Sequence, residues 1–161
     1  MRQIMTLVAL ATLSGGWAPA APALLGERFS ERTFPLCQTY GCRVTERTTV
    51  PGGSSVRLQL KRWDARLLLV LSPYGTVMGL EVWVPGGEVP SAAALSFLQR
   101  VAVQAAEQEF PAGRLGGCFA RLGGRPAGPR SYRLLGGGGE HYGVVCLRKP
   151  GAWGMRVYFD R

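Results

Sequence analysis

The sequence predicts a single α+β domain, mainly an antiparallel sheet, that is stabilised by disulfides. Three observations predict this class: alternating apolar and polar residues between short turns, one long stretch with helical periodicity, and four cysteines. The 161 residues are enough for one ordinary domain with one core. Hydrophobic residues make up 47% of the chain, which is ordinary globular usage, and 23 Gly and 11 Pro indicate many turns.

Residues 1–23 are typical of a secretory signal peptide. Arg2 supplies the positive charge, residues 4–13 form an uncharged apolar stretch, and two small-residue cleavage motifs follow at 18–20 and 21–23. The apolar stretch is shorter than the roughly 20 residues that cross a bilayer. We therefore expect cleavage after one of the two motifs, no transmembrane anchor in the mature chain, and a periplasmic or secreted protein. A buried N-terminal helix is the alternative.

The cysteines form an even set, which favours two disulfides in an exported chain. They are Cys37, Cys42, Cys118 and Cys146. Of the three pairings open to them we favour Cys37–Cys42, because Tyr40-Gly41 can turn this loop, together with Cys118–Cys146. The chain-entropy model assigns about 2 kcal/mol to the short loop and about 3.5 kcal/mol to the long one. A zinc site would require paired short spacings, so we expect no metal and no other cofactor.

The first half of the mature chain predicts a four-stranded antiparallel meander. The predicted strands are residues 43–50, 56–61, 67–71 and 77–84. The third is apolar throughout, which is typical of a central strand, and the fourth places Met78, Leu80, Val82 and Val84 on one face. Short turns join the four strands, whereas parallel neighbours would need long crossovers. Residues 24–35 have no clear period and predict an irregular arm or a short helix.

Residues 91–110 predict one long amphipathic helix. Ser91 can cap it, and Pro111 prevents its continuation. An apolar stripe, formed by Leu95, Leu98, Ala102 and Ala105, is expected to pack on the meander. About three shorter strands follow, at 131–135, 142–148 and 155–160. Residues 24–161 thus form one domain, with an irregular Arg/Gly-rich segment at 111–139.

Positive charge is concentrated after this helix. The formal net charge is +9, and residues 110–161 hold nine Arg or Lys against two acidic residues. Glycines let backbone N–H groups converge on an anion, and arginines add bidentate donors. The candidate anion-binding residues are Arg114, Arg121, Arg125, Arg130 and Arg133. They predict an exported, non-catalytic domain that binds an anionic polymer or an acidic protein surface. A merely solubilising surface is the alternative, because Arg is favoured over Lys throughout the chain.

Aromatic residues accompany charges on the predicted outer strand faces. Trp83 shares the outer face of its strand with Glu81, and Tyr158 shares that of the last strand with Arg156. Basic and aromatic surfaces can stack single-stranded bases or sugars. Such residues more commonly cover the back of a sheet or contact another subunit, and packing is our prediction here.

Two other classes of function remain open. The first is a small secreted hydrolase, in which His141 activates an unpaired Cys118 or Cys146. Alternatively, the hydrolase uses a pair of carboxylates from Glu81, Glu88 and Glu140 for catalysis, although their spacing does not single out a pair. No nucleophile elbow, P-loop or His-Glu-x-x-His motif is present. The other class is a structural or inhibitory partner protein that acts through the outer face of the sheet.

Overall fold

The structure is a computed structural model that describes residues 23–110, 113–123, 128–135 and 141–160. Its elements are α1 (Pro35–Tyr40), β1 (Cys42–Val50), β2 (Gly53–Leu60), β3 (Ala65–Leu71), β4 (Val77–Pro85), α2 (Ala92–Ala106), α3 (Arg114–Ala120), β5 (Arg130–Leu135), β6 (Tyr142–Lys149) and β7 (Ala152–Phe159). The α+β class is confirmed. The predicted signal peptide, except for Ala23, lies outside the described residues.

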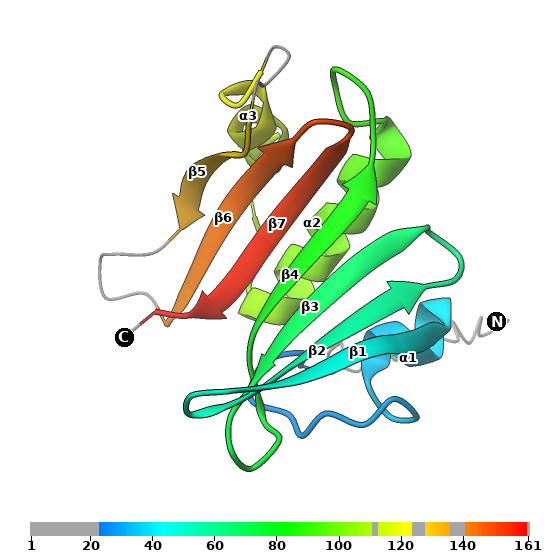
Figure 1. Cartoon of the computed structure of the whole chain (residues 1–161). Coiled ribbons are helices and arrows are strands. Elements are labelled where there is room, and N and C mark those ends of the chain that lie inside the picture. The colour runs from blue at the N-terminus through cyan, green and yellow to red at the C-terminus, as the bar shows by residue number, and fades with distance from the viewer. Residues whose placement is uncertain (1–22, 111–112, 124–127, 136–140, 161) are drawn as a thin grey trace, which may run out of the picture.

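The described strands form one sheet in the order β1-β2-β3-β4-β7-β6-β5, and every neighbouring pair is antiparallel. The first four strands meander, as predicted. α2 and α3 then carry the chain to the opposite edge, from which β5, β6 and β7 return toward the middle (Figure 1). As a result β7 pairs with β4, and the two halves of the chain meet at the centre of the sheet.

α2 packs its apolar face on the sheet, passing behind β4 and β7 in Figure 1. Ser91 caps it, because its hydroxyl accepts a hydrogen bond from the Ala94 amide at 3.1 Å. The helix is shorter than predicted. It ends at Ala106 because Glu107 adopts a left-handed conformation (φ 52°), and Phe110 is buried beyond this turn rather than on the helix.

The predicted details of the meander need two corrections. Val77 takes the buried position that was predicted for Met78, because the register of β3 and β4 shifts between Val70 and Leu71. β3 is an interior strand but is covered on one face only, and Val70 is 46% exposed on the other. The strands β6 and β7 are eight residues long, which lies within the seven to nine residues of the meander strands, so they are not a shorter class of strand.

The segment predicted to be irregular contains the helix α3. Leu115, Cys118 and Phe119 are buried on its inner side, although Gly116 and Gly117 are poor helix formers. A seven-residue helix has little stability of its own. Its helical conformation therefore depends on packing against β5 and β6.

Both favoured disulfides are confirmed. Cys37–Cys42 joins α1 to the start of β1, and Cys118–Cys146 joins α3 to β6. All four cysteines are paired, and all four lie within the described residues. Within the same part of the chain, no helix is long and apolar enough to cross a membrane.

Candidate functional site

The sheet face that points away from the helices is called the open face here. In one register row, residues of all seven strands lie side by side across it: Arg133, Val145, Arg156, Glu81, Leu68, Arg57 and Glu46. Arg156 donates two hydrogen bonds to Glu81 Oε2, at 2.9 and 2.6 Å. Arg57 pairs with Glu46 at the edge of the sheet, and this hydrogen bond is the main reason that the Glu46 pKa lies below its usual value.

A second row, two residues along each strand, contains Trp83 at its centre. Its members are Ser131, Leu147, Gly154, Trp83, Arg66, Gln59 and Arg43. The Trp83 indole N–H donates to Glu81 Oε1, and Lys149 Nζ lies 4.2 Å from the centroid of the ring. Glu81 therefore holds both Trp83 and Arg156 in place.

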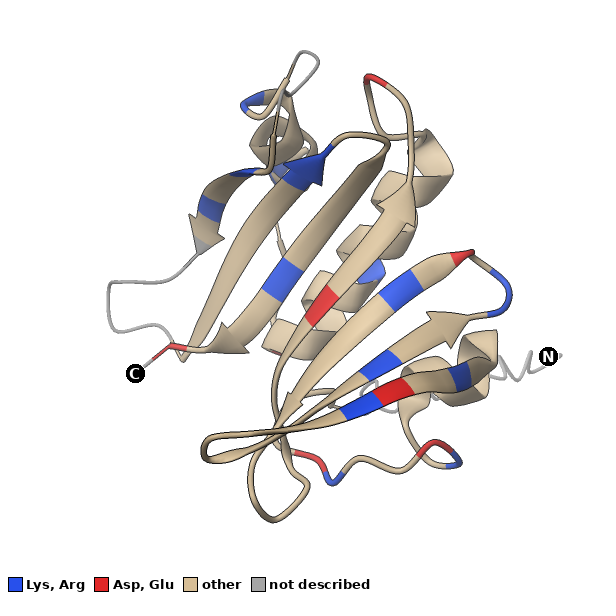
Figure 2. Cartoon of the chain, viewed as in Figure 1, with Lys and Arg blue, Asp and Glu red and all other residues tan. Residues whose placement is uncertain are grey.

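Basic side chains predominate on this face. Among the described strand residues it carries six basic side chains, namely Arg43, Arg57, Arg66, Arg133, Lys149 and Arg156, and two acidic ones, Glu46 and Glu81. Figure 2 shows these charges spread from one edge of the sheet to the other. Arg66 and Arg133 make no ion pair within the described part of the chain. The open face thus presents a positive potential toward solvent.

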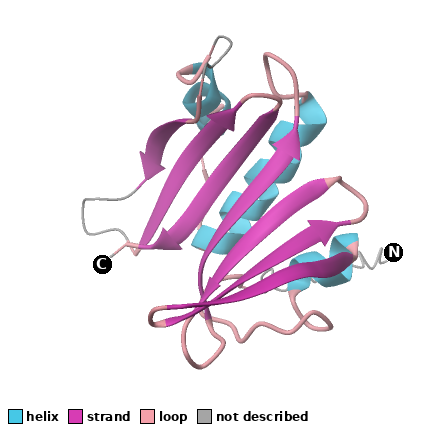
Figure 3. Cartoon of the chain, viewed as in Figure 1, coloured by secondary structure: helices cyan, strands magenta, loops and turns pink. Residues whose placement is uncertain are grey.

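A hollow of about 590 Å³ lies on the open face beside Trp83. Its walls include Arg57, Gln59, Arg66, Leu68, Trp83 and Lys149. The described helices all lie behind the sheet in the view of Figure 3, so none of them covers this hollow. Polar, cationic and aromatic groups that converge around a concave surface are typical of a ligand site.

The rings of Trp83 and Tyr158 lie over glycines of the neighbouring strands. A Cβ added to Gly154 would be 2.6 Å from Trp83 Cε3, and one added to Gly143 would collide with the Tyr158 ring. The sequence assigned Trp83 and Tyr158 to outer faces correctly. It gave no indication that they share one surface, because the pairing of β4 with β7 joins residues about 75 positions apart.

The five arginines predicted to bind anions are divided between two surfaces. Arg133 lies on the open face, whereas Arg114, Arg121 and Arg130 lie along the seam between α3 and β5. Arg125 is outside the described residues. The structure thus brings three of them together, whereas β-strand alternation directs Arg133 to the opposite face from Arg130.

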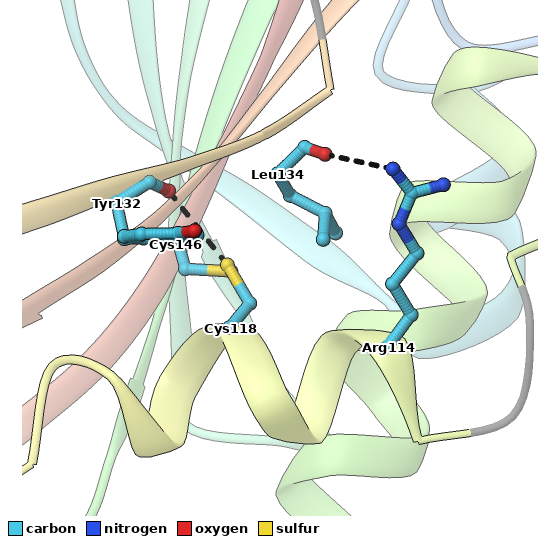
Figure 4. The surroundings of a disulfide bond; sticks show 5 residues. All are labelled: Arg114, Cys118, Tyr132, Leu134 and Cys146. Carbon is cyan, nitrogen blue, oxygen red and sulfur yellow. Dashed lines mark hydrogen bonds between the residues drawn. A yellow bond between two sulfur atoms is a disulfide. The ribbon is translucent and has the colours of Figure 1, made fainter.

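The seam arginines contact the protein itself while remaining exposed. Arg114 Nη2 donates to the Leu134 carbonyl at 3.3 Å, close to the disulfide of Cys118, whose Sγ lies 3.7 Å from the Tyr132 carbonyl oxygen (Figure 4). The Arg121 guanidinium lies 5.0 Å from the centroid of the Tyr132 ring. Arg130 Nη1 donates to the Gly123 carbonyl at 3.4 Å. These contacts leave part of each guanidinium for an external anion.

Arg148, which lies on β6 opposite Arg130, is buried and belongs to neither surface. Its side chain is 3% exposed, and its guanidinium stacks 3.7 Å from the centroid of the Trp153 ring. Nη1 donates to the Glu88 carbonyl at 2.9 Å and, at 3.4 Å, to the Gly87 carbonyl. Arg148 therefore fixes the loop between β4 and α2 instead of meeting solvent.

A hydrolase in which His141 activates a cysteine thiol would lack its nucleophile in this structure. Cys118 and Cys146 are joined to each other, so neither supplies a thiolate to His141, which is exposed. The Glu81 carboxylate is engaged by Arg156 and Trp83, and Glu140 lies outside the described residues. Within the described ranges, no group of three His, Cys, Asp or Glu could hold a metal ion.

Comparison with models of protein families, with curated proteins and with solved structures finds no match to this chain. The open face is therefore judged by its own geometry and charge.

Substitution of Gly154 tests how closely Trp83 lies on the sheet. In Gly154→Ala the new Cβ would also be 2.7 Å from the Val82 carbonyl oxygen, so we expect a loss of about 1–3 kcal/mol in the free energy of unfolding. Gly116→Ala in α3 is the control. Nothing lies within 4 Å of its added Cβ, so it should stabilise by about 0.5–1 kcal/mol. Urea denaturation measures both, and equal effects would contradict the close contact.

Proposed function

We propose that this chain is an exported, non-catalytic domain that binds an anionic polymer, with the open face of the sheet as its principal contact surface. The observation that carries the proposal is the cluster of basic side chains around Trp83 and the hollow beside it. A polymer that lies along the two register rows of the open face contacts several cations in succession, and several weak contacts together give strong binding.

Export is supported by the signal peptide that the sequence predicts at residues 1–23 and by the two disulfides. Disulfides persist in oxidising compartments and are rare in the reducing cytosol of most organisms. In such a compartment the Cys118–Cys146 bond keeps α3, and with it the seam arginines, attached to the sheet.

The Arg/Gly segment remains part of this proposal as an accessory surface. Arg133 belongs to it by sequence and to the open face by position. Arg114, Arg121 and Arg130 hold the edge of the domain together and present additional positive charge. The competing assignment makes this seam the principal contact, as the sequence alone predicts.

Two triple variants of equal charge distinguish these surfaces. One neutralises the open face (Arg66→Gln, Arg133→Gln and Lys149→Gln), and the other neutralises the seam (Arg114→Gln, Arg121→Gln and Arg130→Gln). We expect the open-face variant to elute from immobilised heparin at clearly lower salt. Because each contact with a charged polymer contributes roughly 0.7–0.9 to the slope of log K against log salt, the slope should fall by about 2.

The seam variant is the matched control, since it loses the same three charges. We expect its elution to shift much less. Equal shifts in the two variants would show that heparin retention depends only on net charge, and would refute a specific binding surface. A larger shift in the seam variant would assign binding to the Arg/Gly segment and refute the role of the open face.

A further inference from the structure

We infer that the anionic polymer is a single-stranded nucleic acid whose bases stack on Trp83 and Tyr158. This inference rests on the proposed function and adds the chemical class of the ligand. Nucleic acid is favoured because each of its nucleotides supplies both a charge and a planar ring, and the open face offers partners for both.

The first step of the argument is the orientation of the two rings. Trp83 leans over Gly154 and Tyr158 leans over Gly143, where only a glycine leaves room for them. Each ring therefore uses one face against the sheet backbone and directs the other away from it. An aromatic face held in this way is a platform on which an unpaired base can stack.

The second step is the spacing of the two platforms. Gly154, beneath Trp83, and Tyr158 lie four residues apart on β7, which corresponds to roughly 13 Å along the strand. Adjacent bases of a regular duplex are separated by about 3.4 Å per step. In a duplex each base is stacked between its neighbours at this separation and offers no free face to a ring. Two bases on the two rings must therefore be unstacked, which excludes an intact duplex and favours an extended single strand.

The third step is the position of the charges relative to the rings. Arg156 lies on β7 between the two platforms, and Glu81 fixes its guanidinium there. Lys149 lies over the Trp83 ring at 4.2 Å, and Arg66 neighbours Trp83 on β3. A base that stacks on Trp83 would displace the Lys149 ammonium toward the phosphate of the same nucleotide. The cations and the two aromatic rings can therefore contact the phosphates and the bases of the same nucleic-acid strand.

An acidic polysaccharide or an acidic peptide would use the same cations but would gain less from flat aromatic faces. Stacking of a base on an aromatic side chain is worth roughly a tenfold change in affinity or more. The dependence of binding on the two rings therefore separates nucleic acid from the other anionic polymers.

The test measures the affinity of the disulfide-bonded protein for oligothymidylate by anisotropy, with heparin retention in parallel. We expect Trp83→Leu and Tyr158→Leu each to weaken oligothymidylate binding by about 10-fold, and the double variant by about 100-fold. Heparin retention should hardly change. Trp83→Phe and Tyr158→Phe keep an aromatic face and should retain most of the affinity, while a duplex should bind more weakly than the single strand.

Tryptophan fluorescence gives a second readout. Stacked thymines should quench Trp83, and this quenching should vanish in Trp83→Phe although binding persists. Trp153 is 1% exposed and serves as an internal reference. Thermal unfolding of each variant shows whether a lost affinity reflects a lost fold, and the Phe variants give the answer if the Leu variants unfold.

Each outcome decides one of the two proposals. If the Leu variants bind oligothymidylate as well as the unmodified protein, or if a duplex binds equally well, stacking does not occur and this inference is wrong. Heparin binding that responds to the open-face charges would then still support the proposed function. If neither heparin nor oligothymidylate binds, the proposed function itself fails.

Discussion

Replacing Trp153 by Ala is expected to destabilise the domain by about 4 kcal/mol, the range typical of a buried Trp reduced to Ala. Trp153 is 1% exposed and packs edge-on against Phe119 of α3, with ring centroids 5.5 Å apart. Its indole N–H donates to the Gly87 carbonyl at 3.2 Å. The substitution therefore removes contacts to α3 and to the loop before α2, as well as a large apolar volume.

Arg148 increases the expected loss. Its guanidinium lies against the Trp153 ring, and its Nε is buried without a hydrogen-bond partner among the described residues. In Trp153→Ala this charge would keep its burial but lose the aromatic face that stabilises it. The melting temperature should fall by on the order of 15 °C.

Trp83→Ala is the matched control for this prediction, because Trp83 lies on the same sheet but on its open face. Trp83 is only partly buried, so we expect its removal to cost about 1–2 kcal/mol. Urea denaturation with a common m-value compares the two variants. Comparable losses would show that Trp153 does not anchor the core.

The elements predicted most accurately from sequence are those with strong local patterns. Alternation in residues 56–61 and the turns around them predicted β2 and its neighbours, and Ser91 with the stripe after it predicted α2. α3 was missed because Gly116 and Gly117 oppose a helix locally. Tertiary contacts make this segment helical, namely its disulfide and the burial of Leu115 and Phe119.

The candidate site was predicted in its parts but not as a whole. Alternation assigned Glu81 and Trp83 to one outer face, and Arg156 and Tyr158 to another. That these are the same surface depends on the pairing of β4 with β7, which no local pattern specifies. The Arg/Gly segment attracted attention because its charges are contiguous in sequence, whereas the cations of the open face come from six strands.

Removal of the Cys118–Cys146 disulfide is expected to have the second largest effect on stability. The loop that it closes spans 28 residues, so Cys118→Ala with Cys146→Ala should lose about 3.5 kcal/mol in the free energy of unfolding. Removal of Cys37–Cys42, which spans 5 residues, should lose about 2 kcal/mol. Urea denaturation of the two double variants, compared with the unmodified oxidised protein, measures this difference.

The larger loss should also have a definite location. α3 has seven residues, two of them glycines, and without its bond to β6 it keeps the packing of Leu115 and Phe119 and the exposed contacts of Arg114 and Arg121 with β5. Hydrogen exchange in Cys118→Ala with Cys146→Ala should therefore accelerate first in α3 and in β5, while β1–β4 keep their protection. The open face should keep most of its affinity for heparin, because only Arg133 of its six cations belongs to β5 and the other five lie on strands that retain their pairing. If exchange accelerates evenly over the sheet, or if the short-loop variant is the less stable one, then α3 is not held to the sheet mainly by this disulfide.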